Sequence, residues 1–95
     1  LMGRPRLLDG TGMLFDMRPV GPAFFWMKNT PETLDLIFLA ADGRAVHLVR
    51  NAKPFSETSV GTNQPVAAVL ELAAGEADRL GITLGSMARL PWRKR

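Results

Sequence analysis

With 95 residues, the chain is long enough for one domain and too short for two. Hydrophobic residues make up 46% and charged residues 22% of the sequence, which is typical of a globular fold and excludes general disorder. The formal net charge is +3, but Arg93, Lys94 and Arg95 supply three of the twelve basic residues, and the other nine balance the nine acidic ones. The excess is therefore a C-terminal tail rather than a basic face, and we expect no nucleic-acid partner.

The first part of the chain predicts two short strands with loops around them. Residues 1–8 predict the end of a helix followed by a loop, and residues 9–12, Asp-Gly-Thr-Gly, have turn chemistry. Residues 13–17 form a brief apolar run that predicts a strand. A loop with two prolines and a glycine over residues 19–22 separates this run from an aromatic-rich strand over residues 23–28.

The middle of the chain predicts a hairpin. Residues 33–40 are apolar on both faces except at Asp35, and they predict a second strand. Residues 41–44 are Ala-Asp-Gly-Arg, and Asp-Gly supplies the positive φ that a tight hairpin turn requires. Residues 45–50 are then expected to return as a third strand.

The last part of the chain predicts a strand, a helix and a further strand. Residues 54–63 are polar and predict a loop, and residues 66–72 predict a fourth strand. Residues 73–80 have the composition of a short helix, with Gly81 placed to end it. Residues 82–90 predict a last, interrupted strand.

This order of elements favours antiparallel pairing over parallel βαβ units, because strand follows strand with only a turn between them. We expect a single domain over residues 1–95, mainly β within the α+β class. The expected form is a small antiparallel barrel-like or curled sheet with one or two short helices.

Polar residues within the apolar strands mark the most informative place. If the strand with Trp26 forms a hairpin with the next strand so that Lys28 lies opposite Asp35, every polar residue has a polar partner. Lys28 and Asp35 would then be a cross-strand ion pair at the edge of an aromatic face. Asn29 adds an amide beside Lys28, and Glu71 is a second carboxylate in a strand of core composition.

Three interpretations of this cluster stay open. In the first, Lys28 and Asp35 only pin the hairpin, and the domain is structural or interacts with another protein. In the second, which we prefer, Trp26, Lys28, Asn29, Asp35 and Glu71 form a non-enzymatic site for a small polar or anionic ligand, with Trp26 as a stacking wall and Lys28 as the anion contact. In the third, Asp35 or Glu71 is the general base of a hydrolytic enzyme.

Other site chemistries have little support in the sequence. There is no cysteine, and His47 is the only histidine, so thiolate nucleophiles, disulfides and histidine-rich metal sites are excluded. No phosphate-binding glycine motif and no EF-hand spacing is present. We therefore expect no metal and no cofactor, and a small ligand or a protein as partner. No apolar run approaches the roughly 20 residues of a membrane helix, so no transmembrane segment is expected.

The motifs along the chain resemble those of the domain-of-unknown-function family numbered 192. The resemblance is carried by Leu1-Met2-Gly3-Arg4, Gly12-Met13-Leu14-Phe15, Phe25-Trp26-Met27-Lys28-Asn29-Thr30, Leu34-Asp35, Asp42-Gly43, Val69-Leu70-Glu71 and Leu80-Gly81-Ile82. It covers nearly the whole chain, and the Phe-Trp-Met-Lys-Asn-Thr string is its most specific part. One departure is Gly85-Ser86, where relatives usually have Gly-Asp.

This resemblance implies a location rather than an activity. No biochemical activity is established for the family, and many members carry a signal peptide, which implies an extracytoplasmic (periplasmic or secreted) protein. Members usually begin with another strand. We therefore expect the natural protein to have an N-terminal segment, with a signal peptide and a first strand, ahead of Leu1.

Overall fold

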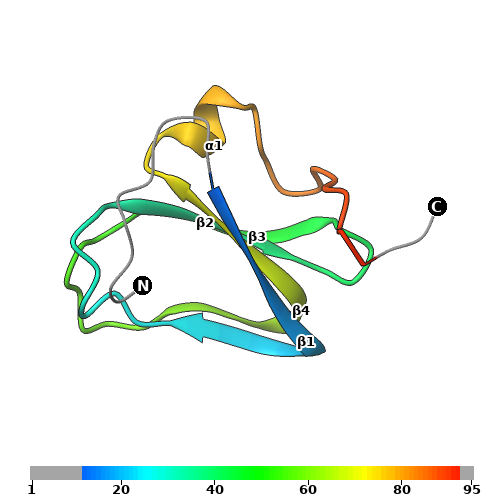
Figure 1. Ribbon diagram of the computed structural model, residues 1–95, viewed down its shortest axis with the longest axis horizontal. Coiled ribbons are helices and arrows are strands. Elements are labelled where there is room, and N and C mark those ends of the chain that lie inside the picture. The colour runs from blue at the N-terminus through cyan, green and yellow to red at the C-terminus, as the bar shows by residue number, and fades with distance from the viewer. Residues whose placement is uncertain (1–11, 93–95) are drawn as a thin grey trace.

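A computed structural model describes residues 12–92 of the chain (Figure 1). This part contains four strands and one short helix, namely β1 (Gly12–Phe25), β2 (Leu34–Leu39), β3 (Ala45–Ala52), β4 (Val60–Ala73) and α1 (Glu76–Arg79). The predictions for residues 1–8, for residues 9–11 of the turn and for the tail at residues 93–95 lie outside the described residues. The expected mainly β class is confirmed, because the four strands form one curled antiparallel sheet that does not close into a barrel.

The strand order is β1-β4-β2-β3, so β2 and β4 are the central strands and β1 and β3 are the edges. The sequence of β2 explains its central place. All six of its residues are buried, and a strand that is apolar on both faces can be stable only when both faces are covered. The Asp-Gly hairpin turn between β2 and β3 is confirmed, with Gly43 at φ +93° and its N–H donating to the Ala40 carbonyl over 2.9 Å.

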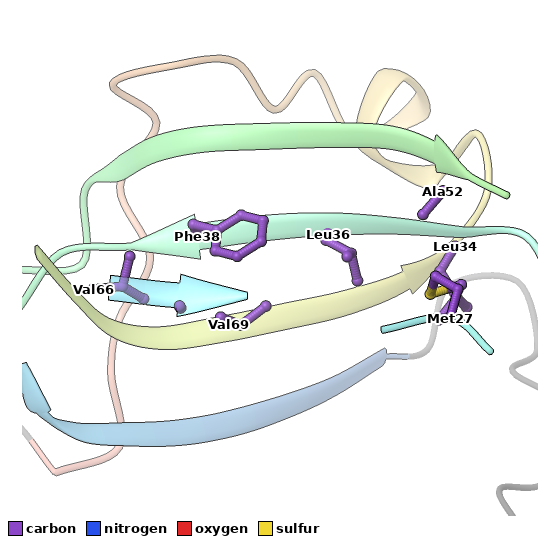
Figure 2. Packing of buried hydrophobic residues seen from close by; sticks show 8 residues of the cluster. Met27, Leu34, Leu36, Phe38, Ala52, Val66 and Val69 are labelled. Carbon is purple, nitrogen blue, oxygen red and sulfur yellow. The ribbon is translucent and has the colours of Figure 1, made fainter. Parts of the chain in front are cut away.

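Two apolar clusters cover the two faces of the sheet. The inner face, inside the curl, carries Leu36, Phe38 and Val69, and Met27 packs into the same cluster (Figure 2). The outer face carries Ile37, Leu39 and Leu72, and residues of α1 and the following segment cover it, among them Ala77, Ile82 and Leu90. Around the two central strands both faces are therefore covered, and a polar side chain there needs a specific reason to be present.

The two strands predicted for residues 13–17 and 23–28 are in fact one strand, and the predicted loop between them is wrong. β1 runs through Pro19 and Pro22, and its pairing with β4 is irregular between Asp16 and Ala23. An edge strand tolerates proline because the missing N–H would have pointed to solvent. The strand also ends early, at Phe25.

Three further predictions need correction near the C-terminus. β4 begins at Val60, so it takes in part of the loop predicted for residues 54–63. The helix is shorter than predicted, but Gly81 does end it, with φ +71° and an N–H that donates to the Asp78 carbonyl over 3.1 Å. Residues 82–90 do not form a strand and make only an isolated bridge between Met87 and Arg44. A turn that places Gly85 at φ +90° interrupts them, and backbone hydrogen bonds to Gly43 and Ala45 hold the segment against the β2–β3 hairpin.

Candidate functional site

Trp26, Lys28 and Asn29 lie together on a loop that follows β1. Between them, the side chain of Met27 points into the core and is 1% exposed, and the Thr30 N–H donates to the Met27 carbonyl over 3.0 Å to close a turn. With Met27 as the anchor, its neighbours turn outward. Trp26 is 58% exposed, and Lys28 and Asn29 are exposed as well.

A second loop, between β3 and β4, braces the first. The Trp26 Nε1–H donates to the Glu57 carbonyl over 2.6 Å, and the Phe55 N–H donates to the Thr30 carbonyl over 3.0 Å. Phe55 has the left-handed φ of +57° and a ring that is 60% exposed. The two loops therefore fix the Trp26 ring and the Phe55 backbone without burying either aromatic ring.

We call Trp26, Lys28, Asn29 and Phe55 the aromatic loop surface. The Lys28 Nζ lies 5.2 Å from the centroid of the Trp26 ring, within the range of a cation–π contact. The only polar atom of the indole already donates a hydrogen bond to the Glu57 carbonyl, so the rest of the ring is an apolar surface exposed to solvent. This surface can stack against a flat ligand and offer an ammonium and an amide at its edge.

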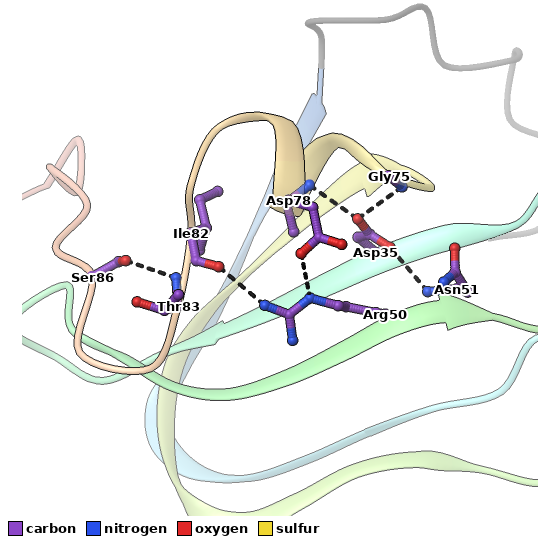
Figure 3. Close-up of polar contacts among 9 residues, drawn as sticks. Asp35, Arg50, Asn51, Gly75, Asp78, Ile82, Thr83 and Ser86 are labelled. Atoms are coloured by element: carbon purple, nitrogen blue, oxygen red, sulfur yellow. Dashed lines mark hydrogen bonds and ion pairs between the residues drawn. The ribbon is translucent and has the colours of Figure 1, made fainter.

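Asp35 lies elsewhere and has a different role. Its carboxylate is 1% exposed and accepts three backbone N–H groups, from Asn51 at 2.9 Å and from Gly75 and Ala77 at 3.0 Å (Figure 3). Gly75 is the N-cap residue of α1 and has no side chain to offer, so the carboxylate of a distant strand performs the capping. Asp35 thus ties together β2, the end of β3 and the start of α1.

The predicted ion pair between Lys28 and Asp35 is wrong, as is the hairpin register behind it. Phe24 and Phe25 at the end of β1 pair with residues 60 and 61 of β4, whereas β2 pairs with β3 and β4. The pattern of polar and apolar residues is compatible with a hairpin between β1 and β2, but in the structure β4 lies between these two strands. Asp35 is satisfied by backbone donors instead.

Glu71 and Asp35 do not share a site. Glu71 lies opposite Leu36 and is 0% exposed on the inner face, whereas Asp35 lies opposite Leu72 on the outer face. A paired-carboxylate hydrolytic site requires both groups to face one substrate, so this geometry does not provide one. Of the five predicted site residues, the structure brings together Trp26, Lys28 and Asn29 and leaves the two carboxylates apart in the interior.

A charged pair on β1 holds the C-terminal segment. The Arg18 guanidinium donates twice to the Asp16 carboxylate, at 2.9 and 2.6 Å, and lies 4.0 Å from the centroid of the Trp92 ring. The side-chain hydrogen bond from Arg18, followed by its backbone N–H, lowers the pKa of Asp16 from 3.8 to about 2. Both charged side chains are exposed to solvent. We therefore interpret the pair as a structural contact that positions Trp92, not as part of a reactive site.

Within residues 12–92, no group of three His, Asp or Glu side chains is arranged to hold a metal ion. The same part of the chain contains no helix long and apolar enough to cross a membrane. The sequence interpretation missed Phe55, although a lone aromatic residue in an otherwise polar loop was a usable signal.

Comparison with known proteins agrees with this fold. Residues 1–90 match the family DUF192, described as Uncharacterized ACR. A solved protein of unknown function from Novosphingobium aromaticivorans DSM 12444 is 42% identical, with a TM-score of 0.88 over 95% of this chain and 64% of its own. A solved protein from Sinorhizobium meliloti 1021, described as a candidate transcription regulator, is 44% identical, with a TM-score of 0.86 over 92% of this chain and 67% of its own. No curated protein matches the chain.

The fold and these matches define a small, mainly β class of protein with a curled antiparallel sheet. The chain belongs to the DUF192 family, as its motifs predicted. It spans about two thirds of the length of the two solved relatives, 64% and 67% respectively.

Proposed function

We propose that the chain is a non-enzymatic binding module whose ligand stacks on Trp26 of the aromatic loop surface. The observation that carries this proposal is an indole that is 58% exposed and yet fixed by a 2.6 Å hydrogen bond to a neighbouring loop. Leaving apolar surface in water costs about 25 cal/mol per Å². A ring that is both exposed and oriented is therefore suited to stacking against a ligand.

The ligand class follows from the groups at the edge of the ring. Lys28 offers a cation 5.2 Å from the ring centroid, and the exposed Asn29 can donate and accept hydrogen bonds. A sugar acid combines a flat apolar ring face with hydroxyls and a carboxylate, so it matches all three groups. The surface is open rather than enclosed, which favours the terminal or exposed unit of a larger glycan over a buried metabolite.

The test is a fluorescence titration with Trp26 as the single reporter, in a Trp92→Phe background. We expect glucuronate or galacturonate oligomers to shift the emission and glucose oligomers to bind more weakly. Trp26→Ala, followed by calorimetry, should lower the affinity about thirtyfold, on the order of 2 kcal/mol. Lys28→Ala should remove the preference for the acid.

Arg89→Ala is the matched control for loss of one exposed cation. Arg89 belongs to the C-terminal segment, away from the loops that carry Trp26 (Figure 1). If a ligand from a broad library binds equally well to Trp26→Ala and to the parent protein, the aromatic loop surface is not the site.

We also propose an extracytoplasmic location for the natural protein, supported by the family resemblance. A fusion of the full-length gene product to alkaline phosphatase, which is active only outside the cytoplasm, tests this directly. An inactive fusion that accumulates in the cytoplasm would refute the location and leave the binding proposal untouched.

A further inference from the structure

A second feature lies on the outer face, away from the aromatic loop surface. A crevice of about 60 Å³ opens between the sheet and the segment that follows α1. Its floor is formed by Ile37, Leu39 and Leu70, and Met87 and Ala88 line its other side. We call it the C-terminal crevice.

The size and lining of the C-terminal crevice limit what can fill it. Its volume is less than half of a roughly 150 Å³ cavity that binds benzene. Its lining is almost entirely apolar, so water gains few hydrogen bonds there. A space of this size and lining suits the branched end of one aliphatic side chain better than a whole aromatic ring.

Hydrogen bonds hold the crevice in its present shape. The Ala45 N–H donates to the Ser86 carbonyl, the Gly85 N–H donates to the Ala45 carbonyl, and the Ala88 N–H donates to the Gly43 carbonyl, each over 2.8 Å. Earlier in the segment, Arg50 donates to the Ile82 carbonyl and the Thr83 N–H donates to the Ser86 hydroxyl (Figure 3). The concavity is therefore preformed, which lowers the entropic cost of binding.

The rim of the crevice is apolar at Met87, which lines the crevice and is exposed to solvent. Leu84 and Met87 are each 65% exposed and are the most exposed large apolar side chains of the described residues. Leu80, earlier in the same segment, is 52% exposed. Exposed apolar side chains on the segment that forms one wall of a concave apolar crevice mark an interaction site.

Charge identifies the kind of partner. From residue 79 to residue 95 the chain has five basic residues and no acidic one, and Arg79, the first of the five, pairs with Glu76 of α1 at 2.7 Å. Arg89, next to the crevice-lining Ala88, is exposed and forms no ion pair within the described residues, and the same holds for Arg44, whose backbone bridges to Met87. Asp42 and Asp78 offset part of this charge, since Asp42 accepts the Arg44 N–H and Asp78 pairs with Arg50.

We propose that the C-terminal crevice docks an acidic segment of a partner protein that inserts one aliphatic side chain, with its carboxylates facing Arg44 and Arg89. A side chain fills a fixed concavity and buries the rim at the same time. A lipid surface would cover Leu84 and Met87 but leave the concavity without a group of the right shape. This site is independent of the ligand proposed for Trp26.

The experiment is a selection of displayed random peptides on the full chain, with Ala88→Ile as the counter-selected variant that fills the crevice. We expect a consensus with a single valine, isoleucine or leucine flanked by Asp and Glu. A synthetic consensus peptide should bind at least tenfold more weakly to Ala88→Ile and to Arg89→Glu. Since Arg89 is exposed, its variant keeps the test valid even if Ala88→Ile fails to fold. Trp26→Ala should bind the peptide like the parent chain.

Three results would overturn the proposal. One is the absence of a consensus, or a basic one. Another is a consensus peptide that binds both variants as tightly as the parent chain. The third is sedimentation of the chain with phosphatidylglycerol vesicles that depends on Leu84 and Met87, which would assign the rim to an anionic membrane instead.

Discussion

Removing the carboxylate of Asp35 should destabilise the protein more than any exposed charge change, because it holds three backbone N–H groups. Hydrogen bonds to a charged group contribute about 1.5–3 kcal/mol each, and a donor left buried without a partner costs about 1–3 kcal/mol. The bonds to Asn51 and Gly75 are only partly buried, so water can replace the carboxylate there, whereas the Ala77 bond is buried. We therefore expect Asp35→Ala to lose about 3 kcal/mol rather than the full sum.

Chemical denaturation and hydrogen exchange measure this effect. A loss of about 3 kcal/mol lowers the melting temperature of a domain this small by roughly 12–24 °C. Asp35→Asn keeps the side-chain volume and should still lose about 2 kcal/mol, which separates lost hydrogen bonds from a cavity. Exchange of the Ala77 amide should rise in both variants, because its acceptor lies on another strand.

Asp78→Asn is the matched control, since the Asp78 side chain is 73% exposed and its pair with Arg50 lies at the surface. It should change the free energy of unfolding by no more than about 1 kcal/mol. The reasoning is refuted if Asp35→Asn lies within about 0.5 kcal/mol of the parent chain. Unchanged protection of the Ala77 amide would refute the capping role by itself.

Gly43→Ala should be strongly destabilising in thermal unfolding, because Gly43 has φ +93° and an added Cβ would lie 2.1 Å from the Ala88 carbonyl oxygen. Gly81→Ala, at φ +71° with open space around it, should lose only the roughly 1–2 kcal/mol of left-handed backbone strain, and equal losses at the two positions would contradict the close approach. Asp16 has its pKa lowered to about 2 by Arg18, so its contribution to stability is present above its ordinary pKa of 3.8 and is lost as the pH falls toward 2. The difference in unfolding free energy between the parent chain and Asp16→Asn should shrink over that range, and a difference constant from pH 5 to pH 2 would show that the pair does not stabilise the fold.

Much of the fold follows from local chemistry that each segment carries by itself. The run from Leu34 to Leu39 is apolar on both faces, which predicts a strand buried on both sides, and the structure buries all of it. Asp42-Gly43 predicts the hairpin turn and Gly81 predicts the helix end, because positive φ is a property of single residues. The β1 error had a local cause too, since Pro19 is disfavoured in a strand only if that strand is central.

The candidate site was predictable only in part. Trp26, Lys28 and Asn29 are neighbours in the chain, so their grouping needed no tertiary information. Their exposure could be known only from the tertiary structure, because the residues Phe25-Trp26-Met27 read the same whether they fold as a strand or as a loop.

By itself, the sequence determined the mainly β class and the hairpin turn at Asp42-Gly43, since periodicity and turn chemistry act over a few residues, and its motifs determined the family. Only the tertiary structure decided that β4 lies beside β1, that Asp35 caps a helix 40 residues away, and that a crevice forms under the C-terminal segment. The physical reason is that the partners of Asp35 are backbone N–H groups, which nearly every residue carries. No side-chain pattern marks such a donor, so its choice depends on where the folded chain places it.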